Sequence, residues 1–263
     1  MTNSFLKKLK NTMLFWGFDP RVFLYNLIGF PGYLKEHRLF KRKTKEVSGI
    51  KIDRLYPVLG DKFKPGAYLT DHYFFQDLLV AQRIFENNPA KHVDVGSRVD
   101  GFVAHVASFR EIEVFDIRPL NNTIPNVKFM QLDFMNPNAE LKDYTDSISS
   151  LHALEHFGLG RYGDPLDPEG HLKGLEAVSN ALKKGGKFYF SSPIGPLRIE
   201  FNAHRVFSLK YLIEIFSKTY IIDSFSYIDD KKIFHPKAIL SVENIQSNFG
   251  CNFGCGIFEM TKL

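Results

Sequence analysis

The feature that most constrains the fold is a regular alternation of strand and helix signals that begins near residue 70. Short runs rich in β-branched and aromatic residues, typical of buried strands, are separated by segments with helical spacing of apolar residues. Seven strands are predicted, within KHVDV, EIEVFDI, NVKFMQLDF, DSISSL, KFYFSSP, YIIDSFSYI and CGIFEM. This alternation predicts an open, mostly parallel α/β sheet with helices on both faces.

Two of the predicted helices have recognisable ends. The helix over residues 70–89 can be capped by Thr70 or Asp71, and its apolar stripe consists of Phe74, Phe75, Leu78, Leu79 and Phe85. A later helix has Asp167 as its candidate N-cap. Gly185 and Gly186 are expected to stop that helix, since glycine favours helix ends.

Length and cysteine content restrict the class of protein. A chain of 263 residues can bury one sizeable core, and no internal repeat is visible. Cys251 and Cys255 are its only cysteines. They therefore imply no disulfide framework and indicate a reducing compartment, in which two buried thiols are the simplest interpretation.

Positive charge is concentrated in the first 51 residues, which hold eleven Lys and Arg against three Asp and Glu. The longest uncharged run of this arm, Val22 to Leu34, has thirteen residues and contains Pro31. A membrane span needs about 20 apolar residues, so none is expected here. Two interpretations stay open: the arm packs on the domain, or its lysines and aromatic residues rest on an anionic membrane surface. We expect a basic extension over residues 1–69 and a domain over 70–263.

Polar residues occur repeatedly where predicted strands end. They are Asp94, Gly96 and Ser97 after the first strand, Asp116 after the second, Asp133 after the third, and Ser150 with His152 after the fourth. Ligands of open α/β sheets bind outside the carboxyl ends of the strands. Asp116 lies 22 positions after Asp94, close to the offset of about 20 at which an acid meets a ribose in dinucleotide folds. The pattern predicts a nucleoside-binding site.

The segment SSLHALEHFGLGRYGD contains an H-x-x-E-H motif formed by His152, Glu155 and His156. In a zinc hydrolase this motif lies on a sustained helix. Here it follows a strand directly, and three glycines arrive within the next seven residues, which opposes a stable helix. We therefore expect no metal site and keep zinc hydrolysis as the least favoured alternative.

Several segments, taken in order, resemble the landmarks of class I S-adenosylmethionine-dependent methyltransferases: HVDVGS, EVFDIRP, FMQLDF, SSLHALEH, LKKGGKFYFSSP and FNAHRVFSLKYL. More narrowly, GLGRYGDPLDPEG and FNAHR look like the domain-of-unknown-function 268 family. The resemblance covers about residues 70–263 and implies a Rossmann-like class I methyltransferase fold. One departure is DVGSRVDG, in which Arg98 and Asp100 replace expected glycines and Gly101 can restore part of the turn. A non-catalytic binding domain of the same fold is therefore the second alternative.

The resemblance also implies how S-adenosylmethionine would be held. Asp94, Gly96 and Ser97 would lie against its methionine part. Asp116 would hold the ribose, and Asp133 with Phe134 the adenine.

The acceptor side is expected beyond the fourth and fifth strands. His152 is the candidate base of the catalysed reaction and His204 its rival, because histidine titrates close to neutral pH. The candidate acceptor-binding residues are His156, Arg161, Tyr162, Asn202 and Arg205. The resemblance implies O-methylation of a sugar or nucleotide-linked sugar in bacterial surface-polysaccharide synthesis. We expect a cytoplasmic protein, with the inner face of the membrane as the place of any lipid contact, and no nucleic-acid partner.

Overall fold

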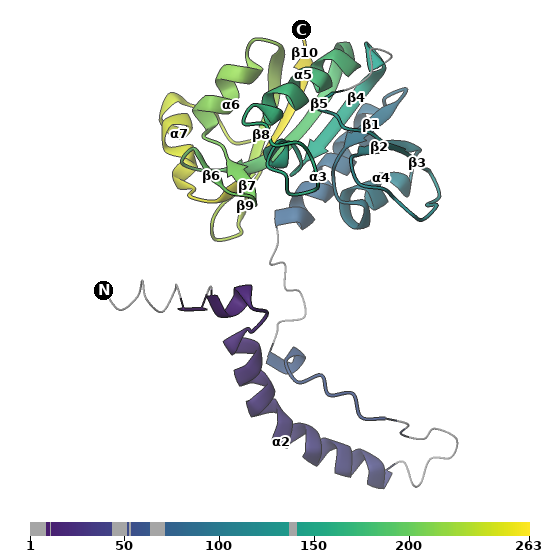
Figure 1. Cartoon of the computed structure of the whole chain (residues 1–263), viewed down its shortest axis with the longest axis vertical. Coiled ribbons are helices and arrows are strands. Elements are labelled where there is room, and N and C mark those ends of the chain that lie inside the picture. Colours follow the sequence, from purple (N-terminus) through teal and green to yellow (C-terminus); the bar gives the residue numbers. More distant parts are fainter. Residues whose placement is uncertain (1–8, 11, 44–51, 53, 64–71, 137–140) are drawn as a thin grey trace. The chain divides into compact units, whose positions relative to one another are not determined.

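The computed structural model of the protein (Figure 1) describes residues 1–263 except 1–8, 11, 44–51, 53, 64–71 and 137–140. The chain divides into two compact units, Met1–Tyr68 and Leu69–Leu263. The cap predicted at Thr70 or Asp71 lies outside the described residues.

The first unit is built around the 24-residue helix α2, Pro20–Lys43. None of its residues is buried, and its last turn carries Lys41, Arg42 and Lys43, where cations are favourable against the helix dipole. Leu59, just before the short 3-10 helix Asp61–Phe63, lies against α2: a Cβ at Gly29 would be 3.1 Å from the Cβ of Leu59. In the described part of the chain, α2 included, no helix combines the length and apolar character that a bilayer crossing requires.

The second unit contains an eight-stranded sheet in the order β3-β2-β1-β4-β5-β10-β8-β9. Its strands are β1 His92–Val95, β2 Ile112–Asp116, β3 Val127–Gln131, β4 Thr145–Leu151, β5 Leu182–Ile194, β8 Tyr220–Ile228, β9 Phe234–His235 and β10 Gly254–Lys262. The first five pair in parallel, whereas β10 lies antiparallel between β5 and β8. The predicted mostly parallel sheet is confirmed. Its strand β9, too short to carry a periodic pattern, is missing from the prediction, and so is a separate antiparallel pair of two strands at 198–200 and 204–206.

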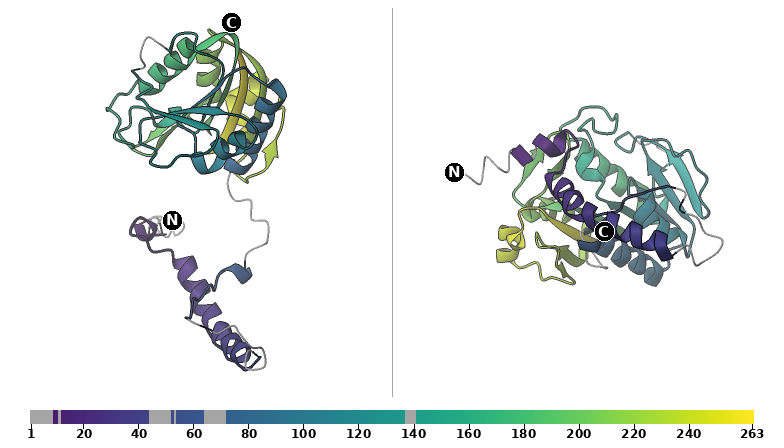
Figure 2. Two further views of the ribbon diagram at one scale, coloured as in Figure 1. Left: turned by 90° about the vertical axis from the view of Figure 1, so that its right-hand side faces the viewer. Right: turned by 90° about the horizontal axis from the view of Figure 1, so that it is seen from below.

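Helices cover both faces of this sheet, as Figure 1 and Figure 2 show. They are α3 His72–Asn87, a π-helical turn Val99–Val103, α4 Ala104–Ala107, α5 Gly170–Ala181, α6 Leu209–Phe216 and α7 Val242–Ser247. Side chains alternate along a strand, so Val114 packs with α3 and α4 while its neighbour Phe115 packs in the core that contains α5 and α6. Full burial of such a side chain contributes roughly 1.5–3 kcal/mol.

The face that α3 buries differs from the prediction. Phe74, Leu78 and Phe85 are exposed, whereas the buried positions are Gln76, Asp77, Val80, Ala81 and Ile84. Gln76 is accommodated because its Oε1 accepts a hydrogen bond from the Ser191 hydroxyl at 2.6 Å. Phe75 and Leu79 of the predicted stripe are half-buried against the core on this face. The prediction was wrong for Phe74, Leu78 and Phe85, because a buried polar residue with a partner on β5 cannot be recognised from apolar spacing.

The ends of α5 also differ from the prediction. Glu169, not Asp167, occupies the N-cap position. The Asp167 carboxylate instead accepts from the Glu169 amide and from Lys173 Nζ. The helix ends at Ala181, and the glycine pair at 185–186 lies inside β5. In this chain the glycines belong to the start of the strand.

Candidate functional site

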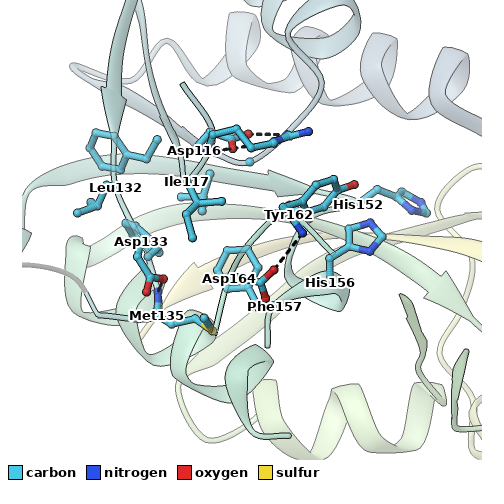
Figure 3. A pocket seen from close by; sticks show the side chains of 16 residues that line it. Asp116, Ile117, Leu132, Asp133, Met135, His152, His156, Phe157, Tyr162 and Asp164 are labelled. Atoms are coloured by element: carbon cyan, nitrogen blue, oxygen red, sulfur yellow. Dashed lines mark hydrogen bonds and ion pairs between the residues drawn. The ribbon is translucent and has the colours of Figure 1, made fainter. Parts of the chain in front are cut away.

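A pocket opens at the carboxyl ends of β1, β2, β3 and β4 (Figure 3). Its volume, open mouth included, is about 510 Å³. Asp133 and Met135 lie at one end, His152 and His156 at the other. The predicted site residues that line it are Gly96, Asp116, Asp133, Phe134, His152, His156 and Tyr162. Segments up to 66 positions apart (96 to 162) thus meet at one sheet edge, because parallel strands end on the same side.

The turn after β1 depends on Gly96. Its φ of +72° is rarely adopted by other residues, and a Cβ there would lie 3.0 Å from that of Ala153. Arg98 has an extended backbone and forms an exposed ion pair with Asp100 at 3.1 Å. Gly101 is required for another reason, since its Cβ would approach Asp77 Oδ2 to 2.6 Å. The turn therefore needs one residue of positive φ, which lies against the pocket.

Asp94 and Ser97 do not line the pocket. Asp94 is fully buried, and its Oδ1 accepts from the hydroxyls of Ser97 and Ser149, each at 2.6 Å. Ser97 Oγ in turn accepts from the Leu151 amide at 3.0 Å. Burial raises the pKa of Asp94 to about 6, although the serine hydrogen bonds oppose this. These two side chains join the turn after β1 to β4.

Asp116, the last residue of β2, is held by Arg118. The carboxylate accepts from the Arg118 amide at 2.8 Å, from Nε at 3.0 Å and from Nη2 at 2.7 Å. The guanidinium lies over the Tyr162 ring, 4.3 Å from its centroid. A carboxylate offers about four acceptor positions, so three donors leave room for one more.

The other end of the pocket combines an acid with apolar walls. Asp133 follows β3, and its oxygens accept from the Met135 amide at 3.0 Å and from Asn136 Nδ2 at 3.1 Å. Phe134 is 3% exposed and packs on Phe115, with ring centroids 5.9 Å apart. A flat, apolar ligand group with a hydrogen-bonding edge fits this arrangement.

The H-x-x-E-H motif does not form the helix that a zinc protease of this type requires. His152 follows β4 with a φ of +51°, and residues Leu154–His156 form a single 3-10 turn. His152 Nε2 lies 3.3 Å from Cys255 Sγ, and His156 Nδ1 lies 2.7 Å from the Ala203 carbonyl. Over the described ranges, no three His, Cys, Asp or Glu side chains are grouped to hold a metal ion.

Glu155 lies between these histidines and is fully buried. Its Oε1 is 3.0 Å from His152 Nδ1 and 3.8 Å from His156 Nε2, yet neither carboxylate oxygen has an aligned hydrogen-bond donor among the described residues. Burial raises the pKa of Glu155, which the charge of His156 opposes. Burial lowers the pKa of His156, which Glu155 opposes.

The glycine-rich loop beyond this turn closes around Asp164. Its Oδ2 accepts from the amides of Gly158 at 2.7 Å and Gly160 at 3.3 Å, and its Oδ1 from the Tyr162 amide at 3.2 Å. Asp164 and Tyr162 both line the pocket. Arg161 is exposed; its Nη1 donates to the Ala203 carbonyl at 2.9 Å, and its guanidinium lies 5.1 Å from the Tyr162 centroid.

Four predicted acceptor-side residues do not line the pocket: Arg161, Asn202, His204 and Arg205. Arg205, 3% exposed, donates to the backbone carbonyls of residues 155, 157, 167 and 168. Burial lowers its pKa. It thus holds both ends of the glycine loop. His204 packs on Phe253 with centroids 5.1 Å apart, and Asn202 is exposed between β6 Arg198–Glu200 and β7 His204–Val206.

Arg118 and Met135 line the pocket but were not among the predicted site residues. Arg118 had a detectable signal, because a basic residue two positions after a strand-end acid can fold back on it. Met135 had none, since an isolated apolar residue after a strand is typical of any core.

Comparison with solved structures identifies the class of fold. The chain superposes on the [4+2]-cyclase SpnF with a TM-score of 0.51 and 14% identity, over 71% of this chain and 80% of that one. It superposes on the Burkholderia thailandensis 1,6-didemethyltoxoflavin-N1-methyltransferase with a TM-score of 0.51 and 13% identity, over 74% of this chain and 80% of that one. With the N-methyltransferase NodS from Bradyrhizobium japonicum WM9 the TM-score is 0.50 and the identity 12%, over 74% of this chain and 99% of that one. The fold is that of the class I S-adenosylmethionine-dependent methyltransferases, as predicted.

The chain belongs to the family described as "Caenorhabditis protein of unknown function, DUF268", whose model matches residues 106–248. The predicted family membership is thereby confirmed. A search of curated proteins finds no match.

Proposed function

We propose that this protein is an S-adenosylmethionine-dependent methyltransferase. The observation that carries the proposal is the pocket at the strand ends, with Gly96 after β1, Asp116 at the end of β2 and Asp133 after β3. An acid at the second strand end suits a pair of ribose hydroxyls. The fold does not settle the reaction, because a cyclase shares it.

The residues present fit the cofactor. Phe115, Leu132 and Met135 supply apolar walls beside Asp133 for an adenine, and Asp116 retains acceptor capacity for ribose. Gly96 leaves the backbone accessible beside them. When bound, S-adenosylmethionine supplies an electrophilic methyl group on its sulfonium.

On the acceptor side, His152 would act as general base for a hydroxyl, with His156, Arg161 and Tyr162 around the acceptor. The exposed guanidinium of Arg161, which lies beside the Tyr162 ring, suits a phosphate. We take the acceptor to be a sugar or nucleotide-linked sugar of bacterial surface-polysaccharide synthesis, on the family resemblance alone.

The first unit suggests where the reaction takes place. Phe23, Leu27 and Ile28 are each more than half exposed on α2, ahead of the basic turn 41–43. Apolar residues followed by cations suit the headgroup region of an anionic membrane. We propose a cytoplasmic enzyme whose basic arm contacts the inner face of the membrane.

Calorimetry with S-adenosylmethionine and S-adenosylhomocysteine tests the proposal. Binding by both, together with methyl transfer to candidate sugar nucleotides, would support it. Binding without transfer to any acceptor favours the non-catalytic alternative, and no binding by folded protein rejects the cofactor. One equivalent of zinc, lost in a variant lacking His152 and His156, would restore the hydrolase alternative.

A further inference from the structure

The turn after β4 buries a carboxylate that the proposed function does not use. Glu155 has no exposed surface, and both oxygens lack an aligned donor among the described residues. A buried polar group without a hydrogen bond destabilises the folded state, and a buried charge does so more strongly. A compensating group must therefore lie close to Glu155 when its carboxyl is ionised.

Two imidazoles lie within reach, and only one is suited to donate. His156 Nδ1 lies 2.7 Å from the Ala203 carbonyl, which can only accept, and 3.4 Å from Arg161 Nη1, which can only donate. The carbonyl is much the closer partner, so we assign the proton of a neutral His156 to Nδ1. Its Nε2, 3.8 Å from Glu155, then has no hydrogen to offer. His152 Nδ1, at 3.0 Å from Glu155 Oε1, is within hydrogen-bond distance, and a change in ring orientation can align it.

The other ring nitrogen of His152 faces β10. Nε2 lies 3.3 Å from Sγ of Cys255, which is 1% exposed. If Nδ1 carries the proton, Nε2 carries the lone pair and accepts from the thiol. The ring is further restrained by His72 and Tyr73 of α3, whose centroids lie 4.3 and 5.3 Å from its own.

We propose that Glu155 is a positioning residue that keeps His152 in the Nδ1–H tautomer and so leaves Nε2 as the proton acceptor. The Cys255 thiol occupies Nε2 until an acceptor hydroxyl replaces it. The hydroxyl proton then passes to Nε2, and Glu155 compensates the positive charge of the imidazolium. This inference rests on the proposed role of His152 as the base.

The arrangement explains two features that are otherwise unfavourable. A left-handed backbone at a histidine is uncommon and unfavourable, so surrounding contacts must offset it. At His152 it places one ring between a carboxylate and a thiol. Among the residues that the structure describes, the titratable groups that face this ring include Glu155 and His156 on its own turn, Cys255 on β10, and His72 and Tyr73 on α3.

Long-range ¹⁵N NMR of the full-length protein, with ¹⁵N-labelled histidine, reads the tautomer directly. His152→Gln identifies the signals of this ring among the nine histidines. We expect the Nδ1–H tautomer in the wild type. Glu155→Gln should lower the midpoint of the His152 titration by about one pH unit, because the opposite charge is lost. Glu155→Met, which offers no comparable acceptor, should abolish the tautomer preference.

Matched variants separate this role from a merely structural one. Glu113→Gln removes a carboxylate on β2 that accepts from Tyr144 at 2.7 Å, and should leave the His152 signals unchanged. Cys255→Ala should preserve the tautomer. An Nε2–H tautomer in the wild type, an unchanged midpoint in folded Glu155→Gln, or a tautomer that depends on Cys255 alone would overturn the inference.

The NMR test needs neither cofactor nor acceptor. Absence of S-adenosylmethionine binding would refute the proposed function, whereas the tautomer would still decide the role of Glu155. Once an acceptor is known, Glu155→Gln should lower kcat at least about tenfold with cofactor affinity unchanged within about threefold, because Glu155 acts through the base.

Discussion

Asp116 and Arg118 should have different effects on cofactor binding. Asp116 is the proposed ribose ligand, yet Arg118 already donates three hydrogen bonds to it. Ribose hydroxyls must therefore share the carboxylate with the guanidinium or displace it. We expect Asp116→Ala to weaken binding of S-adenosylhomocysteine, and Arg118→Met to leave it within about threefold of wild type or tighten it.

The magnitude follows from the contacts. Asp116→Ala removes a carboxylate that is 12% exposed, and a hydrogen bond to a charged group contributes about 1.5–3 kcal/mol. The substitution also removes the contacts of Asp116 with Arg118. A net loss of one hydrogen bond to the ligand corresponds to a rise in the Kd of S-adenosylhomocysteine of roughly 10- to 150-fold. Arg118 is 49% exposed, so losing the ion pair should cost at most about 1 kcal/mol of stability.

Isothermal titration calorimetry with S-adenosylhomocysteine measures the Kd of Asp116→Ala and of Arg118→Met. Asp223→Ala is a matched control, since this aspartate forms its ion pair with Lys187 on the sheet away from the pocket lining. Thermal unfolding of each variant checks that the fold is intact. Wild-type affinity in Asp116→Ala would refute the ribose assignment. Equal weakening by both pocket substitutions would show that Arg118 itself contacts the ligand.

Three further predictions follow from the same geometry. His152→Ala should lower turnover by about 10²–10⁴ and leave cofactor affinity within a few-fold of wild type. His204→Ala should change turnover little, because His204 does not line the pocket. The reverse ranking in steady-state kinetics would exchange their roles. Liposomes with anionic lipid should retain the full chain at low salt but not a variant lacking residues 1–45, and high salt should weaken retention by screening the charges. Equal sedimentation of both forms would assign the arm to packing on the protein. Burial raises the pKa of Asp94 to about 6 from 3.8, so the folded state binds this proton more tightly than the unfolded state does. The contribution of Asp94 to stability should therefore fall by about 1–3 kcal/mol as the pH rises from 4 to 6. Denaturant unfolding of wild type and Asp94→Asn across this range should show the difference, and parallel pH profiles would contradict it.

Much of the sheet could be predicted because its signal is local. A strand such as β2, with the sequence IEVFD, is a short and mostly apolar run between polar turns, and the order of the strands along the chain indicates parallel pairing. The buried face of α3 could not be predicted, because Gln76 is stabilised by Ser191, 115 positions away. The end of α5 at Ala181 depends in the same way on a distant segment, since the next residue, Leu182, pairs with Thr145 of β4.

The sequence alone determined the alternation of strands and helices, and with it the positions where Gly96, Asp116, Asp133 and His152 meet at one edge. Strand order and side-chain period are enough for this, because parallel strands end together. Only the tertiary structure decided which polar side chains face the pocket. Arg205 donates to backbone carbonyls, and Asp94 accepts from serines on neighbouring segments. Buried polar groups must find hydrogen-bond partners, and those partners come from distant parts of the chain.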